Sequence, residues 1–225
     1  MSKLISVIIP AYNGERYISE AISSVQEQQM NTEILVVDDG SDDKTAQIAQ
    51  STGVYLFHTK HQGAESARNI GIQKSRGDYI LFLDCDDILV KGSLQRMYDF
   101  LEQNPDISYV HAKVKEFLSP DAHKRAVRSE PYTGILTGAF LFKKQFFKQI
   151  GMFDENLQAG GGIDLILRAK AAGIKSHELD IIATQRRIHD NNMGILNRSG
   201  EYKDYLTILR KQLLLKKTSK TIKKC

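Results

Sequence analysis

Cysteine and long apolar segments are both scarce in this sequence, and each shortage excludes a class of protein. The 225 residues include two cysteines, Cys85 and Cys225, which are too few for a disulfide framework. No apolar segment approaches the roughly 20 residues that a helix needs to span a bilayer. Cysteine and histidine spacings typical of zinc sites are missing as well. A protein of the reducing cytoplasm, without structural zinc, is therefore expected.

The N-terminus superficially resembles a signal peptide, because Lys3 precedes a short apolar stretch. That stretch has no small-residue cleavage site and leads directly into Tyr12, Asn13 and Gly14. We therefore interpret it as a first β-strand.

Positive charge is concentrated at the C-terminal end. The chain has a net charge of +4, but residues 210–225 contain seven Lys or Arg and no acidic residue. The rest of the chain is slightly acidic, which argues against a nucleic-acid-binding face. We interpret the tail as a solvated terminus. The alternative is a weak peripheral contact with anionic lipids on the inner face of the membrane, made by lysines 216, 217, 220, 223 and 224.

Residues 4–104 alternate between buried-strand and helical patterns, which predicts an α/β fold with a mixed, mainly parallel sheet flanked by helices. Short β-branched runs predict the strands, and apolar residues at helical spacing predict the helices. Strands are expected in residues 4–12, 33–41, 54–59 and 79–84, and helices in residues 15–29, 43–52, 64–75 and 93–104.

The second half is less regular, yet it shows no repeat and no low-complexity linker, so a single domain over residues 1–200 is expected. Residues 201–225 are predicted to form an amphipathic helix followed by the basic tail. The remaining expected elements are strands in residues 107–117 and 175–189, a polar loop in 119–134, a strand and short helix in 135–151, and a helix in 163–173.

Polar residues follow three of the predicted parallel strands: Tyr12 and Asn13, then Asp38 and Asp39, then residues 84–87. The carboxyl ends of parallel strands form the edge where open α/β sheets bind ligands. We therefore expect these three groups to converge on one site.

The third group, Asp84, Asp86 and Asp87, places three carboxylates within four positions, where they repel one another unless compensated. An Asx turn or a helix cap explains Asp87 alone. A hard divalent cation explains the group better, because Mg²⁺ and Mn²⁺ prefer oxygen ligands and bind through one or two carboxylates plus phosphates. Phosphoacceptor receiver domains also use such acids, but they are shorter, and their acid pair normally follows the first strand.

The order of the motifs resembles the family-2 inverting glycosyltransferases with the GT-A fold, and the resemblance extends to about His189. It implies a donor half over about residues 1–104 and an acceptor half over about 105–200. The segments involved are "SVIIPAYNGERYISEAISSVQEQ", "EILVVDDGSDDKT", "GAESARNIGI", "GDYILFLDCDD", "GAFLFKKQFFKQIGMFDENL" and "DLILRAKAAG".

The resemblance implies a nucleoside-diphosphate sugar as donor, with UDP as the expected nucleotide, and a glycan, lipid-linked or other hydroxyl as acceptor. It also implies a Mn²⁺ or Mg²⁺ cofactor held by Asp86, with His189, near the phosphates, as the second metal-site residue. Donor contacts are implied for the base (Pro10, Ala11, Tyr12, Asp38), for base or ribose (Asp39), for the nucleotide (Arg68) and for the ribose hydroxyls (Asp84). Several of these residues have a simpler structural alternative: core packing for Tyr12, helix capping for Asp38 or Asp39, a surface position for Arg68, and a structural role for His189.

The sequence departs from this family at the expected catalytic base. Family members have an acidic pair before the helix that here reads "DLILRAKAAG", whereas this chain has Gly161 and Gly162 and retains only Asp164. Three interpretations remain open: Asp164 is the base, Asp154 or Glu155 reaches the site, or the protein binds nucleotide sugars with impaired transfer. Glycine has no side chain to accept a proton, and Gly160–Gly162 are expected to form a loop.

Overall fold

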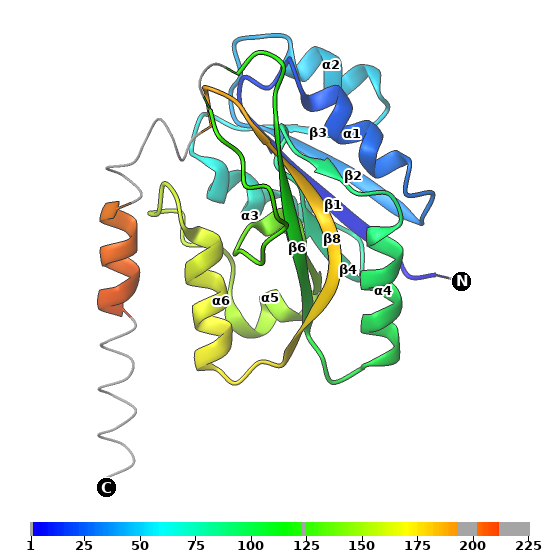
Figure 1. The fold of residues 1–225 in the computed structure, drawn as a ribbon, viewed down its shortest axis with the longest axis vertical. Coiled ribbons are helices and arrows are strands. Elements are labelled where there is room, and N and C mark those ends of the chain that lie inside the picture. Colours follow the sequence, from blue (N-terminus) through cyan, green and yellow to red (C-terminus); the bar gives the residue numbers. More distant parts are fainter. Residues whose placement is uncertain (1, 123–124, 193–201, 212–225) are drawn as a thin grey trace, which may run out of the picture.

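The computed structural model describes residues 2–122, 125–192 and 202–211, and these form an eight-stranded sheet with helices on both faces (Figure 1). The strand order is β3-β2-β1-β4-β7-β6-β8-β5. The strands are β1 (Ile5–Ala11), β2 (Thr32–Asp38), β3 (Tyr55–His58), β4 (Tyr79–Phe82), β5 (Ile88–Leu89), β6 (Tyr109–Leu118), β7 (Phe140–Lys143) and β8 (Ser176–Ile188). The helices are α1 (Ile18–Gln26), α2 (Thr45–Ser51), α3 (Ala64–Lys74), α4 (Ser93–Gln103), α5 (Gln145–Ile150) and α6 (Gly161–Ala171), with a 3₁₀ turn at Thr137–Ala139.

The first half of the sheet is parallel, as predicted. Strand β1 pairs with both β2 and β4, and β2 pairs with β3. The register places Ala11 opposite Asp38, so β1 and β2 end at the same level. This register determines which side chains meet at the carboxyl edge.

The second half makes the sheet mixed, which confirms the predicted fold class. Strand β7 runs antiparallel between β4 and β6, whereas β6 and β8 pair in parallel. The two-residue strand β5, which was not predicted, pairs with β8 and lies directly after the acidic segment. It thereby connects residues 84–87 to the end of β8, about a hundred positions later in the chain.

The sheet separates two apolar cores. Helices α1, α2 and α4 cover one face, and α3, α5 and α6 cover the other (Figure 1). Alternate side chains of β1 enter each core, because successive residues of a strand point to opposite faces: Val7 and Ile9 join the first, and Ile8 joins the second.

The second core also shows why α3 approaches the sheet so closely. A Cβ atom on Gly71 would lie 2.3 Å from Cγ2 of Ile8, so only glycine fits there. This contact fixes the position of α3, which contains the functional candidate Arg68.

The predicted loop at Gly160–Gly162 is wrong for two of its three residues. Gly160 has a φ of 78° and precedes α6, whereas Gly161 and Gly162 form the first turn of that helix. The amide of Asp164 donates to the carbonyl oxygen of Gly160 at 3.0 Å, which closes the turn.

The predicted C-terminal helix is present over residues 202–211 and packs beside the loop that precedes α6 (Figure 1). One carboxylate oxygen of Asp204 accepts the amides of Gln158 and Ala159, each at 2.7 Å. The predicted boundary near residue 200, the remainder of the helix, the tail lysines and Cys225 lie outside the described residues. Within the described part, no helix has the length and apolar character needed to cross a membrane.

Candidate functional site

The three polar groups that follow β1, β2 and β4 do converge at one end of the sheet. The amide of Asp39 donates to the carbonyl oxygen of Ala11 at 2.7 Å, which joins the ends of β1 and β2. On the other side, a Cβ on Gly14 would lie only 2.9 Å from Sγ of Cys85. The turn after β1 therefore packs directly against the acidic segment after β4.

Asp38 and Asp39 are both 3% exposed, and both accept hydrogen bonds within the protein. The Asp38 carboxylate accepts the amide of Ser41 at 3.2 Å and lies 3.2 Å from Nδ1 of His58. The carboxylate of Asp39 accepts the amides of Gln62 and Gly63, each at 2.8 Å. These two acids thus hold the loops after β2 and β3 in place at the edge of the site.

Tyr12 extends from the end of β1 and is 47% exposed, so it is not a core residue. Its ring lies against the imidazole of His61, with centroids 4.1 Å apart and planes tilted by 32°. Pro10 and Ala11, which precede it, are buried in the strand. Tyr12 therefore presents a partly exposed aromatic ring at the carboxyl edge of the sheet.

Arg68 is only 8% exposed and is bound by two carboxylates. One guanidinium nitrogen donates to Glu65 at 2.9 Å and another donates to Asp84 at 2.8 Å. Burial lowers the pKa of Arg68, but the two neighbouring carboxylates raise it by more, so the side chain remains charged. Its Nε atom is buried without a hydrogen-bond partner among the described residues.

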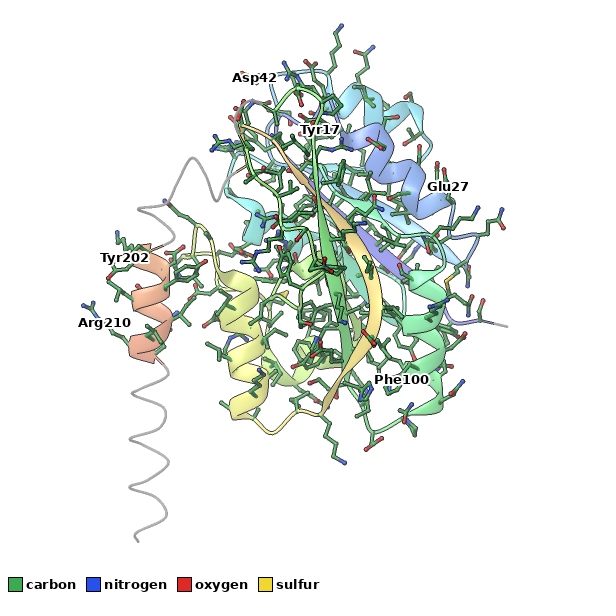
Figure 2. All side chains as sticks on the ribbon, viewed as in Figure 1. Tyr17, Glu27, Asp42, Phe100, Tyr202 and Arg210 are labelled. Carbon is green, nitrogen blue, oxygen red and sulfur yellow. The ribbon has the colours of Figure 1, made fainter. Side chains whose placement is uncertain are left out.

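Asp86 meets two residues from beyond the end of β8. Its Oδ2 atom lies 2.9 Å from Nε2 of His189, and it accepts the side-chain amide of Asn192 at 3.2 Å. The backbone amide of His189 donates to Oδ1 of Asn192 at 2.7 Å, which orients the Asn192 side chain, and Nδ1 of His189 accepts the backbone amide of Asn191 at 3.2 Å. The imidazole also packs against the ring of Tyr17, which Figure 2 places at this end of the molecule.

Asp87 is separated from the site. It is 5% exposed, and its carboxylate accepts the amide of Arg187 at 2.9 Å. Burial, together with the charges of Asp86 and Asp84, raises the pKa of Asp87 well above its usual value. The three predicted acids therefore have three different environments: Asp84 faces Arg68, Asp86 faces His189, and Asp87 anchors β8.

Asp164 lies on α6 and is 3% exposed. Its carboxylate accepts Nε of Arg168 at 2.8 Å, and the same guanidinium donates to the carbonyl oxygens of Ile150 and Met152. These contacts tie α6 to the segment after α5. Asp164 is not among the residues that line the cavity described next.

A cavity of about 660 Å³ opens beside the Arg68–Asp84 pair. It extends between the start of α6, the end of β8 and the segment around residue 125. Glu65, Arg68, Asp84, Glu116, Gly162 and Asn192 are among the residues that line it.

The sequence did not single out Glu65, Arg187 or Asn192. Glu65 had a local signal, since it precedes Arg68 by three positions on one helix face. The other two had none, because their contacts with residues 84–87 join positions about a hundred residues apart.

Among the residues described, no group of three or more His, Cys, Asp or Glu side chains could by itself hold a metal ion. Asp86 and His189 nevertheless present an oxygen and a nitrogen atom 2.9 Å apart. Such a set fits Mg²⁺ or Mn²⁺ when substrate phosphates and water supply the other ligands. The residues present therefore fit a divalent cation that takes part of its coordination from other groups.

Comparison with known proteins gives a consistent family. The model of glycosyl transferase family 2 matches residues 6–162. An uncharacterized glycosyltransferase from Rickettsia typhi is 32% identical over 89% of this chain and 70% of its own length. One from Haemophilus influenzae is 42% identical, but over 45% of this chain and 43% of its own length.

Solved structures agree on the fold. TarS from S. aureus in complex with UDP has a TM-score of 0.73 at 22% identity, covering 94% of this chain and 64% of that chain. The mannosyltransferase PcManGT from Pyrobaculum calidifontis, in complex with GDP-Man and Mn²⁺, also has a TM-score of 0.73, at 16% identity, with coverages of 93% and 64%.

Proposed function

Because the chain belongs to glycosyl transferase family 2, we propose that it transfers a sugar from a nucleoside diphosphate to an acceptor hydroxyl with the aid of a divalent cation. The observation that supports this proposal most is the arrangement at the carboxyl edge. There the Arg68–Asp84 ion pair borders a cavity of about 660 Å³. Asp86, two residues after Asp84, contacts His189.

The donor nucleotide binds, in this proposal, along the ends of β1, β2 and β4. The exposed ring of Tyr12 stacks on the base, and Asp38 lies behind it at the end of β2. Asp84 has one oxygen on Arg68, which leaves the other for the ribose hydroxyls. UDP is the expected nucleotide, in keeping with the TarS complex.

Asp86 and His189 are the residues that would hold Mn²⁺ or Mg²⁺, and the side-chain amide of Asn192 supports the Asp86 carboxylate. A cation held there supplies positive charge to the diphosphate that departs, which makes it a better leaving group. The protein's own contribution is to hold its carboxylate oxygens in place before the cation and the nucleotide bind, so that little reorganisation is needed when they do.

Calorimetry with UDP tests the proposal directly. We expect UDP to bind in the presence of MnCl₂ and to bind much more weakly after EDTA is added. The Asp86→Ala variant should bind UDP equally weakly under both conditions. Asp99→Asn, an exposed acid on α4, serves as the matched control and should behave as the parent does. Equal UDP affinity of the parent with and without EDTA would contradict the role of the cation.

The sugar is identified by a screen. Thermal shift with UDP-, GDP- and dTDP-sugars should show one nucleotide class that stabilises the protein most, because a ligand that binds only the folded state raises the melting temperature.

A second function, binding of nucleotide sugars with impaired transfer, is favoured by a different observation. Gly161 and Gly162 begin α6 without side chains, and Asp164 is held by Arg168 away from the cavity. If no other carboxylate accepts the acceptor proton, donor binding occurs and turnover is slow. A measurement of sugar transfer separates the two functions.

A further inference from the structure

The carboxylate of Glu65 occupies the space that a side chain on Gly161 would fill. A Cβ built on Gly161 would lie 2.3 Å from both Cδ and Oε1 of Glu65, and 2.7 Å from Oε2. Gly161 lies in an ordinary helical turn with no positive φ, so its backbone does not require glycine. A side chain at position 161 would therefore have to displace the carboxylate of Glu65.

Glu65 is held firmly in that place. It lies in the first turn of α3, a helix fixed against the sheet by the contact between Gly71 and Ile8. Its side chain is 6% exposed, and Oε2 accepts Nη1 of Arg68 at 2.9 Å. A carboxylate fixed by a buried guanidinium loses little freedom when it engages a substrate.

One oxygen of Glu65 remains available. No described residue donates a hydrogen bond to Oε1, and this oxygen is not completely buried. Since Glu65 also lines the cavity, Oε1 can meet a group bound there.

The other carboxylates near the cavity are more fully engaged. Glu116 accepts the hydroxyl of Tyr132 with one oxygen and the amide of Arg128 with the other. Asp84 binds Arg68 and, in the proposed function, the ribose. Asp164 does not line the cavity.

From this geometry we propose that Glu65 is the general base for transfer, a role that rests on the proposed function. Oε1 takes the proton of the acceptor hydroxyl as the acceptor oxygen bonds to the anomeric carbon. The bond from that carbon to the diphosphate oxygen breaks, and its electron pair leaves with the nucleoside diphosphate. Glu65 thus supplies from α3 the carboxylate that Gly161 and Gly162 do not supply from α6.

The first test uses donor hydrolysis, in which water replaces the acceptor. UDP-GlcNAc, UDP-glucose and GDP-mannose are the probes, and release of the nucleoside diphosphate is measured. Glu65→Gln should lower kcat by about 10²–10⁴-fold, the usual range for a general base. The affinity for UDP with MnCl₂ should change by less than about threefold, because the amide oxygen of glutamine can still accept from Arg68.

The pH profile distinguishes a base from a residue that merely positions Arg68. For the parent, kcat should rise with pH on its acidic side, and this limb should be absent in Glu65→Gln. The charged groups that share the cavity with Glu65 are Arg68, on the same helix, together with Asp84, Glu116, Arg125 and Arg186.

A transplant keeps the proposal testable if Glu65→Gln is unstable. Gly161→Glu alone should lower the melting temperature, because its Cβ would overlap the Glu65 carboxylate. The double variant Glu65→Ala with Gly161→Glu should recover the melting temperature of the parent. Its kcat should be at least tenfold higher than that of Glu65→Ala alone.

The outcomes separate this proposal from the proposed function. Absence of UDP binding to the parent would overturn the proposed function. A parent that binds UDP but hydrolyses none of the three donors would overturn the role of Glu65 and leave nucleotide-sugar binding alone. UDP binding with unchanged kcat and pH profile in Glu65→Gln would also overturn the base, while leaving transfer intact.

Discussion

Nε2 of His189 lies 2.9 Å from Oδ2 of Asp86, although 103 positions separate the two residues in the chain. The contact exists because β5, directly after the acidic segment, pairs with the last part of β8. Among the described residues, Nε2 of His189 is the only nitrogen atom in contact with the Asp86 carboxylate that can ligate a cation. The side-chain nitrogen of Asn192 also contacts Asp86, but an amide nitrogen only donates hydrogen bonds.

We predict that His189→Ala raises the MnCl₂ concentration at the midpoint of UDP binding by about 10–100-fold, the usual loss of metal affinity when a ligand or its support is disturbed. The measurement is a titration of MnCl₂ at fixed UDP. His177→Gln, at the opposite end of β8, is the control, because His177 stacks on Phe100 far from the site (Figure 2). A parent-like MnCl₂ midpoint in His189→Ala would exclude this histidine from the cation site.

Tyr12→Ala is predicted to weaken UDP binding by about 1–3 kcal/mol, the usual contribution of one aromatic ring stacked on a base. The melting temperature should hardly change, because the side chain is 47% exposed. Calorimetry measures the affinity, and Tyr12→Phe, which keeps the ring, should bind UDP as the parent does. If alanine and phenylalanine bind equally well, Tyr12 does not stack on the base.

Glu33 is predicted to make stability depend on pH. Its buried carboxylate accepts the hydroxyl of Ser6 at 2.6 Å and Nε of Arg76 at 2.8 Å. Burial raises the pKa of Glu33, but these hydrogen bonds lower it by more, so the net direction is downward. A lowered pKa in the folded state means that the stabilisation is present above the unfolded value of about 4.3 and is lost as the pH falls through the folded value.

We therefore expect Glu33→Gln to reduce the free energy of unfolding by about 1–3 kcal/mol at pH 7, through unsatisfied buried donors. The difference from the parent should shrink below about pH 4, because the parent loses the same charge there. Urea unfolding at a series of pH values measures it. Glu27→Gln, exposed on the surface (Figure 2), should match the parent throughout.

Asp204 is predicted to attach the helix over residues 202–211 to the loop before α6. Asp204 accepts the amides of Gln158 and Ala159. On the same helix, Ile208 is 2% exposed and lies against Gly160. Asp204→Ala should reduce the free energy of unfolding by about 1–3 kcal/mol. It should also accelerate hydrogen exchange at the amides of Gln158 and Ala159 at least tenfold. Lys203→Ala, an exposed neighbour, should leave the exchange unchanged. Unchanged exchange in Asp204→Ala would show that the helix is held by other contacts.

Periodicity alone was enough to predict the parallel half of the sheet. Each of its strands is a short apolar run followed by a helical pattern, and this local alternation permits few topologies. The ends of the helices were less predictable. Helix α1 begins at Ile18 rather than at residue 15, because the carbonyl oxygen of Gly14 accepts the amides of Tyr17 and Ile18 in a turn.

The positions of the site residues follow the same division. Residues that end parallel strands, such as Tyr12, Asp38 and Asp84, were predictable because the strand pattern already implies that they share an edge. Arg187 and Asn192 were not, since they arrive at the same edge through the pairing of β8 with β5 and β6. No local pattern encodes such long-range pairing.

At the start of α6, the sequence determined only that Gly161 and Gly162 stand shortly before Asp164 and offer no side chain there. The tertiary structure decided what fills the space, because α3 and α6 approach closely enough for the Glu65 carboxylate to occupy the volume of a side chain on Gly161. Residues 65 and 161 are far apart in the chain, and the fit between a carboxylate and a missing Cβ atom depends on distances of 2–3 Å. Packing of this kind is fixed only when both helices have docked on the same face of the sheet.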